Sequence, residues 1–339
     1  MLRKVLAIAV FVSLSLGAMA APLRISLPPD MGAVPVALGV AWGLFQEEGV
    51  EVELVPLPGQ RDRMVAFQAG QVDAVVTDLT SALMLASQLP DEVAIVSTAY
   101  YPLSQDSLHL ALITQDYSGI DELSDFVTGV GDKIVRIAVP RQSDLEFALD
   151  NLFSQQGLTP PEDAYIGQDD LLINATWVLF GMVSAGVLPQ PYVDYLLHYD
   201  FEGKPKLLVL SDFSGVPVPP SVIVFHRSFL TARLDEVNAF FRAVTRAVDR
   251  INTAGREELL ATGWDTAVEL FFPGLDPDSL EPEARARVEQ AIDEIHIPDF
   301  PPPGPIPQEI FDLVREWAQG KGYLNGEVDY DRVTAAWKG

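Results

Sequence analysis

Three segments of this 339-residue sequence occur twice in the same order, and this internal repetition constrains the fold more than any other feature. Residues 23–28 (LRISLP) return as 135–140 (VRIAVP), 44–50 (LFQEEGV) as 152–158 (LFSQQGL), and 70–76 (GQVDAVV) as 181–187 (GMVSAGV). One such match would be chance, whereas three matches in one order indicate two lobes of similar plan. The repeating unit is far too long for the stacked units of a solenoid protein.

The second copy of the first segment combines a strand, a turn and a helix. Residues 134–139 are apolar with one exception and rich in β-branched side chains, and the proline that follows ends the strand that they predict. Ser143 and Glu146 have the spacing of a capping box, so a helix is expected over 144–155. The turn before this helix lies at the carboxyl end of a strand and beside unpaired helix N–H groups. Open α/β sheets bind polar ligands at such places.

Strand and helix patterns alternate along the first copy, which implies a largely parallel sheet. One helix is expected over 34–48, and a strand predicted over 108–114 is assigned to the first lobe. We expect lobe 1 to begin with 21–114, lobe 2 to comprise 115–215, and 216–339 to return to lobe 1 and add C-terminal helices. The chain then crosses between the lobes twice.

The first twenty residues have the pattern of a secretory signal peptide. Arg3 and Lys4 precede an apolar run over 5–16, and residues 18–20 (AMA) form a small-x-small cleavage site. The run is too short to span a bilayer, and no later stretch is long enough. We therefore expect cleavage after residue 20 and a soluble, monomeric periplasmic protein. An uncleaved signal that acts as a membrane anchor is the alternative.

The composition excludes several classes of partner. The net charge is −26, and such an acidic surface disfavours nucleic acid and anionic lipid. The chain has no cysteine, so it lacks the lipid-attachment residue of a bacterial lipoprotein. We therefore expect no direct insertion into a membrane.

The motifs of common enzymes and metal sites are missing from the sequence. The four histidines show no metal-ligand spacing, and without cysteine a zinc site is not expected. No Gly-x-Ser-x-Gly motif and no Walker loop occurs. The sequence therefore predicts no catalytic residue, no metal site and no cofactor.

Several segments together resemble the solute-binding proteins of ABC importers. They are residues 41–52 (AWGLFQEEGVEV), 70–78 (GQVDAVVTD), 133–140 (KIVRIAVP) and 187–192 (VLPQPY), with the tail at 320–332. The most similar branch serves nitrate, sulfonates, taurine and thiamine-pyrimidine precursors. This resemblance implies a type II periplasmic-binding fold, in which two α/β lobes close by hinge motion on a small ligand. It also implies an ABC permease in the inner membrane as partner.

The resemblance places the ligand among loops at the carboxyl ends of strands in both lobes. The residues of this chain at such positions are Asp30, Met31, Gln60, Asp78, Thr80, Tyr100, Tyr101, Arg141, Gln142, Ser143 and Tyr192.

Some of these residues have a structural interpretation as well. Asp78 precedes a helix and can be its N-cap, a ligand acceptor or both. Ser143 builds the capping box described above, and Arg141 can form an interlobe ion pair instead of binding an anion. Tyr100 and Tyr101 are adjacent at a strand end, so we expect at most one of them to point inward.

The loops indicate the ligand class only through their charges. They offer Arg61 and Arg141 against four aspartates, Asp30, Asp62, Asp78 and Asp144. This bias favours a neutral or weakly basic heteroaromatic compound, such as a thiamine-type pyrimidine or a flavin. Taurine, another sulfonate or nitrate remains the alternative, because helix N-termini bind such anions without arginine.

The function expected from these features is capture of a small organic molecule and its delivery to an ABC permease. Two other functions remain open. The chain can serve as a sensory subunit that reports its ligand to a membrane receptor, or as an exported lyase or hydrolase built on the same fold.

Overall fold

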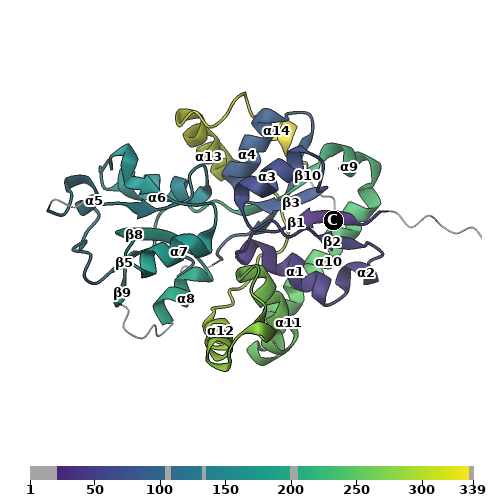
Figure 1. Cartoon of the computed structure of the whole chain (residues 1–339). Helices are drawn as coiled ribbons and strands as arrows, with labels where there is room; N and C mark the ends of the chain where they lie inside the picture. The colour runs from purple at the N-terminus through teal and green to yellow at the C-terminus, as the bar shows by residue number, and fades with distance from the viewer. Residues whose placement is uncertain (1–20, 104–107, 132–134, 199–204, 336–339) are drawn as a thin grey trace, which may run out of the picture.

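The computed structural model describes residues 21–103, 108–131, 135–198 and 205–335. The expected signal peptide over 1–20 lies outside these residues. The described chain folds into two lobes, each built on a five-stranded sheet, and Figure 1 shows them side by side. None of the helices in these ranges is long and apolar enough to cross a membrane.

The sheet of the first lobe has the strand order β2-β1-β3-β10-β4. Its strands are β1 (Leu23–Ser26), β2 (Val52–Leu54), β3 (Ala74–Thr77), β4 (Val93–Tyr100) and β10 (Ser221–His226). β1 is parallel to β2 and β3, whereas β10 is antiparallel to β3 and β4. The strands are connected by η1 (Met31–Ala33), α1 (Val34–Ala41), α2 (Leu44–Glu47), α3 (Gln60–Gln68) and α4 (Leu79–Gln88).

The second lobe repeats this plan with the order β7-β6-β8-β5-β9. Its strands are β5 (Leu110–Gln115), β6 (Ile137–Ala138), β7 (Tyr165–Ile166), β8 (Ala185–Pro189) and β9 (Leu207–Ser211). Its helices are α5 (Asp125–Thr128), α6 (Asp144–Gln155), η2 (Glu162–Ala164), α7 (Leu171–Leu179) and α8 (Tyr192–His198). β1 and β6, which carry the first repeated segment, hold the same place in their sheets, as do β3 and β8. The prediction of two α/β lobes joined by two crossovers is confirmed.

Two details of the sequence-based description are wrong. β5 was assigned to the first lobe within 21–114, but it pairs with β8 and β9 in the second sheet, so the first crossover precedes it. The helix expected over 34–48 is broken into α1 and α2. Gly43 lies between them with φ +71°, a left-handed conformation that glycine adopts without strain and that ends α1.

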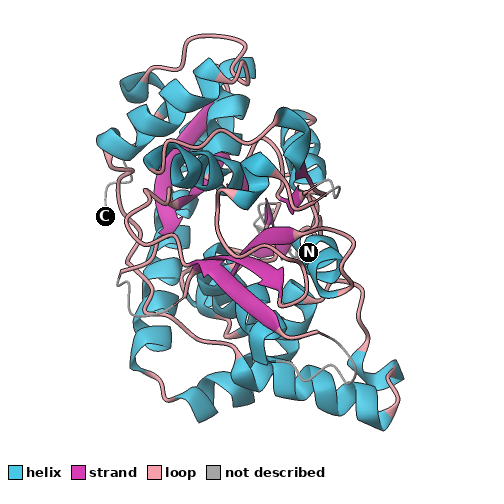
Figure 2. Cartoon of the chain, turned by 90° about the vertical axis from the view of Figure 1, so that its left-hand side faces the viewer, coloured by secondary structure: helices cyan, strands magenta, loops and turns pink. Residues whose placement is uncertain are grey.

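The C-terminal part is helical, as expected. It comprises α9 (Arg227–Ala232), α10 (Leu234–Thr253), α11 (Arg256–Phe271), η3 (Pro277–Ser279), α12 (Pro282–Glu294), α13 (Gln308–Gly320) and α14 (Tyr330–Val333). α10 packs Phe240 and Phe241 against Phe225 of β10, whereas α4 and α13 cover the opposite face of the same sheet. Figure 2 shows helices on both sides of the strands. α12 reaches the second lobe and contacts α8.

A close backbone approach holds the loop after β7 at the edge of the second sheet. Val139 N–H donates to the Ile166 carbonyl at 2.8 Å, which brings the next residue, Gly167, onto the backbone of Val139. A Cβ atom at Gly167 would lie 2.5 Å from the Val139 carbonyl oxygen. Only glycine therefore fits at this position.

We predict that Gly167→Ala lowers the free energy of unfolding by about 1–3 kcal/mol, because the methyl group forces β6 and β7 apart. Urea denaturation measures the change. Gly320→Ala is the matched control, since a Cβ there meets nothing within 4 Å. Equal stabilities of the two variants would contradict the prediction.

Candidate functional site

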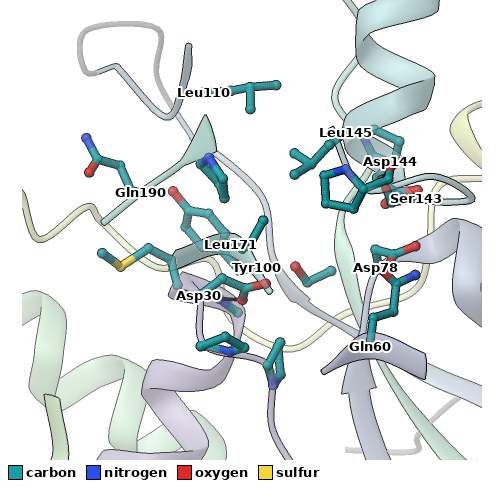
Figure 3. A pocket seen from close by; sticks show the side chains of 18 of the residues that line it. Asp30, Gln60, Asp78, Tyr100, Leu110, Ser143, Asp144, Leu145, Leu171 and Gln190 are labelled. Atoms are coloured by element: carbon teal, nitrogen blue, oxygen red, sulfur yellow. Dashed lines mark hydrogen bonds between the residues drawn. The ribbon is translucent and has the colours of Figure 1, made fainter. Parts of the chain in front are cut away.

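A cleft of about 130 Å³ lies between the lobes, at the carboxyl ends of strands from both sheets. Seven of the residues predicted from the sequence line it, namely Asp30, Met31, Gln60, Asp78, Tyr100, Tyr101 and Ser143. In Figure 3, Asp30, Tyr100 and Gln190 lie on one side of this cleft, and Gln60, Asp78, Ser143 and Asp144 on the other. A ligand in the cleft would therefore lie between an aromatic wall and a wall of carboxylates.

Two aspartates from different lobes meet at the N-terminus of α4. Asp78 is the N-cap of this helix, and its carboxylate accepts from Ser81 N–H and from the Ser81 hydroxyl, both at 2.8 Å. Asp144, the first residue of α6, accepts from Leu79 N–H and Thr80 N–H at 2.9 Å and from the Thr80 hydroxyl at 2.6 Å. The positive end of the α4 dipole favours negative charge at this place. Together the two carboxylates occupy the amides of Leu79, Thr80 and Ser81.

The environment of this pair favours its protonated form. Burial and, after it, the negative charge of Asp78 raise the pKa of Asp144 to about 8, although the hydrogen bonds from Thr80 and Leu79 oppose the shift. Burial also raises the pKa of Asp78. Because two carboxylates in one buried site repel each other, the pair holds a proton more firmly than a solvated aspartate does.

The capping interpretations of Asp78 and Ser143 are both confirmed. The Ser143 hydroxyl accepts from Glu146 N–H at 3.3 Å and donates to the Pro140 carbonyl at 2.6 Å. Both residues also line the cleft, so a role in ligand binding stays a prediction for each.

Four predicted residues do not line the cleft. Thr80 is buried behind Asp144, to which its hydroxyl donates. Arg141 donates to Glu146 at 2.9 Å, and its side chain lines a separate surface pocket. Gln142 has φ +62° and offers its carbonyl to Gln60 Nε2 at 3.3 Å. Tyr192 is fully buried, and its hydroxyl donates to the carbonyl of Phe271 in α11.

Both Tyr100 and Tyr101 line the cleft. That at most one of them faces the ligand stays a prediction. β4 ends at Tyr100, and Tyr101 begins the connection to the second lobe, so the alternation of side chains along a strand no longer applies. The Tyr100 hydroxyl is hydrogen-bonded to His109 Nδ1 at 3.0 Å.

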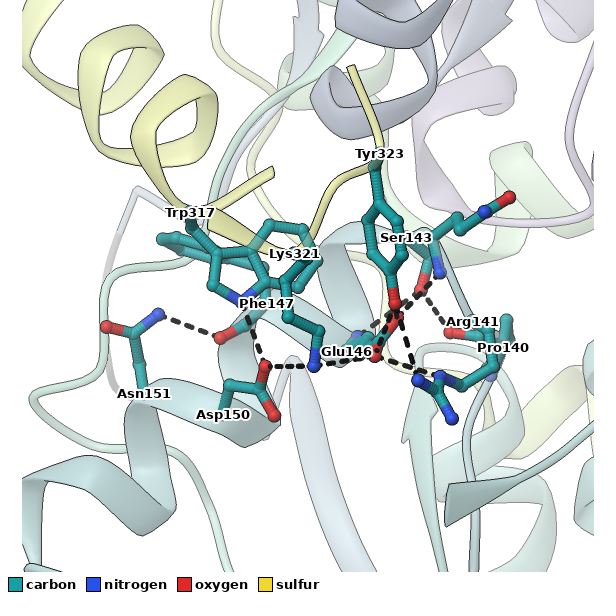
Figure 4. Close-up of polar contacts among 11 residues, drawn as sticks. Pro140, Arg141, Ser143, Glu146, Phe147, Asp150, Asn151, Trp317, Lys321 and Tyr323 are labelled. Atoms are coloured by element: carbon teal, nitrogen blue, oxygen red, sulfur yellow. Dashed lines mark hydrogen bonds and ion pairs between the residues drawn. The ribbon is translucent and has the colours of Figure 1, made fainter. Parts of the chain in front are cut away.

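A second connection between the lobes is built around Glu146 of α6, which is completely buried (Figure 4). Its carboxylate accepts from the Tyr323 hydroxyl at 2.9 Å and pairs with Lys321 at 3.1 Å and with Arg141. Tyr323 and Lys321 follow α13 and belong to the first lobe. The same face of α6 holds Asp150, which accepts from Trp317 Nε1 at 2.9 Å.

A third connection lies on the opposite side of the cleft, between α8 and the helices α11 and α12. Asp194 accepts from His296 N–H at 2.7 Å. The rings of Tyr195 and Phe272 pack edge to face with centroids 5.7 Å apart. The lobes therefore contact each other on both sides of the cleft.

Two cleft residues outside the predicted set bear on ligand chemistry. Arg63 is only 5% exposed; it donates through Nη1 to the carbonyls of Leu57 and Pro58, and its Nε has no hydrogen-bond partner among the described residues. Gln190 follows β8 and donates to the Leu108 carbonyl at 2.8 Å. Arg63 was not predicted because it lies within α3, whereas the prediction placed the ligand among loops. The position of this helix after β2 was the signal that could have identified it.

Asp30 and Arg63 both line the cleft, and the charge of each shifts the pKa of the other. One of the Asp30 carboxylate oxygens accepts from Gly32 N–H at 2.8 Å and so caps η1. Burial raises the pKa of Asp30 to about 6, although the charge of Arg63 opposes the shift. Burial lowers the pKa of Arg63, and the charges of Asp30 and Asp78 oppose that shift. The cleft thus has an excess of acidic groups over basic ones, with the single guanidinium set into its wall.

No protein-family model matches the sequence, and no curated protein sequence is similar to it. Solved structures are similar in fold. The alkanesulfonate-binding protein of Xanthomonas axonopodis pv. citri bound to MOPS superposes with a TM-score of 0.70 at 16% identity, over 94% of this chain and 100% of that chain. The periplasmic nitrate-binding protein of Synechocystis PCC 6803 gives a TM-score of 0.55 at 13% identity, over 93% and 91% of the two chains.

A third similar structure is a Candida albicans protein that exhibits the generic periplasmic binding protein fold. Its TM-score is 0.58 at 14% identity, over 93% of this chain and 96% of that one. The present chain therefore has the periplasmic-binding-protein fold.

In the residues that the structure describes, no group of three or more His, Cys, Asp or Glu side chains is arranged to hold a metal ion.

We predict that Asp144 makes the stability of the protein depend on pH. The pKa of Asp144 is about 8 in the folded chain against an ordinary 3.8, so the folded state keeps a proton that the unfolded state has lost. The resulting stabilisation is complete below pH 4 and falls as the pH rises through 8. The wild type should lose at least about 1 kcal/mol relative to Asp144→Asn between pH 5 and pH 9.

Denaturation at a series of pH values tests this difference. Asp163→Asn, an exposed site in the same lobe, controls for the loss of one negative charge. Parallel stability profiles of the wild type and Asp144→Asn would show that Asp144 titrates normally.

Proposed function

We propose that the chain is an extracytoplasmic solute-binding protein that holds a small organic molecule in the interlobe cleft and delivers it to an ABC permease. The observation that carries this proposal is the cleft between the lobes, which lies at the strand ends of two sheets and is lined by polar side chains from both lobes. Residues 1–20 would direct its export, and the mature chain would act as a periplasmic monomer.

We further propose a neutral or weakly basic nitrogen heteroaromatic as the ligand, for example a thiamine-type pyrimidine. Tyr100 and Tyr101 can pack against a planar ring, and the free oxygen of Asp30 can accept from a ring N–H or an exocyclic amine. A cationic or neutral ring suits a cleft in which aspartates outnumber arginines.

A sulfonate or nitrate is the second candidate, because similar folds bind these anions and the Nε of Arg63 is available. The α4 N-terminus argues against it. Its N–H groups, which would bind an anion, already donate to Asp78 and Asp144.

Thermal-shift measurements with pyrimidines, flavins, sulfonates and nitrate test the ligand class. We expect the melting temperature to rise with nitrogen heteroaromatics and to stay unchanged with nitrate. Mass spectrometry of whatever co-purifies with the protein gives an independent identification. Turnover of any of these compounds without a thermal shift would favour the enzymatic alternative.

Asp30→Asn should weaken binding of a weakly basic ligand by about 1–3 kcal/mol, because a charge-assisted hydrogen bond is lost. For a protonated ligand, affinity should rise as the pH increases through 6, where Asp30 becomes charged. Isothermal titration calorimetry measures both effects. Asp62→Asn removes the same charge from an exposed position outside the cleft and should leave affinity unchanged. If Asp30→Asn and Asp62→Asn bind equally well, Asp30 only caps η1.

A further inference from the structure

A second cavity of about 70 Å³ lies in the first lobe beside the cleft, among η1, α1, α10, α11 and α12. Its wall is hydrocarbon except at Thr266, and it includes Leu38, Ile251, Leu259, Leu270, Phe271 and Ile292. This space opens partly onto the surface and offers a ligand almost no polar group. Transfer of an apolar substituent from water into it would be favourable.

Only one layer of side chains separates this cavity from the cleft. Met31 lines both spaces. Phe300 lines the cavity, and its ring packs against that of Tyr100, which lines the cleft, with centroids 5.3 Å apart. Methionine is unbranched and flexible, so Met31 can change rotamer and open a passage at low cost.

An apolar groove on the outside joins the same two spaces by a second path. This groove is lined by Pro29 and Pro58, which also line the cleft, and by Ala37, Thr266 and Leu270, which also line the cavity. The cleft, the groove and the cavity are therefore neighbours that share wall residues, and polar side chains are concentrated in the cleft.

We propose that the solute is amphiphilic: its polar head occupies the cleft, and an alkyl chain or apolar substituent passes Met31 and fills the cavity. The occupant is assigned to the same solute because Met31 lines both spaces and Phe300 of the cavity packs on Tyr100 of the cleft. The inference rests on the proposed function and adds to it a subsite for hydrocarbon. The cavity is large enough for a few carbon atoms, so the apolar part is a short chain or a single ring.

A series of 4-alkylimidazoles tests the proposal, because its members share a weakly basic heteroaromatic head that keeps its ring N–H and differ only in tail length. Calorimetry with imidazole, 4-methylimidazole, 4-butylimidazole and 4-hexylimidazole should show affinity rising about three- to fourfold per methylene until the cavity is full. Ala267→Leu places a larger side chain in the cavity wall and should abolish this rise while leaving imidazole binding intact. Ala261→Leu, an exposed position on the same helix, should preserve it.

The outcomes separate this inference from the proposed function. Binding of imidazole without dependence on tail length, or with a dependence that survives Ala267→Leu, overturns the subsite and leaves the cleft site standing. If no member of the series binds, the proposed head class is wrong, and benzene then tests the cavity alone. Benzene binding that is lost in Ala267→Leu supports the hydrocarbon subsite, and no benzene binding overturns it.

Discussion

The contact on which the arrangement of the lobes depends is the set of hydrogen bonds from the N-terminus of α4 to Asp144. The donors belong to the first lobe and the carboxylate to the second, and all of them are buried. Separation of the lobes would remove the partners of the Leu79 and Thr80 amides and expose a group that burial keeps protonated. Opening of the cleft is therefore linked to hydration of these donors and to titration of Asp144.

The sequence predicted the fold correctly for the strands whose place in the sheet follows from the repeated segments. The repeated segments identified β1 with β6 and β3 with β8, because a buried parallel strand reads as an apolar run. β5 was misplaced for a related reason. Its run of buried residues, Leu110–Gln115, suits the interior of either sheet, and the choice of partner depends on β8 and β9, which lie far along the chain. Local sequence does not contain that information.

Only part of the site could be predicted from the sequence, namely the contacts between residues close together in the chain. The spacing of Ser143 and Glu146 predicted the cap, but the same carboxylate draws Arg141 into a network with Tyr323, a residue that only the tertiary fold brings near. Tyr192 was expected at the edge of the cleft and is instead covered by α11. Strand ends thus locate a site, whereas the covering helices decide which of its side chains remain accessible.

The groups that accept hydrogen bonds from the N–H groups at the N-termini of α4 and α6 give the clearest indication of ligand charge. In this chain the α4 N-terminus is satisfied by two carboxylates of the protein itself. At the α6 N-terminus the Ser143 hydroxyl accepts from Glu146 N–H, and the Glu146 carboxylate accepts from Gln142 N–H. An anionic solute would have to compete with these internal acceptors for the N–H groups of α4. A solute that donates hydrogen bonds finds acceptors already in place. These contacts are the reason for proposing a hydrogen-bond donor as the solute, and the apolar cavity beside Met31 is the reason for proposing that this donor carries an apolar substituent.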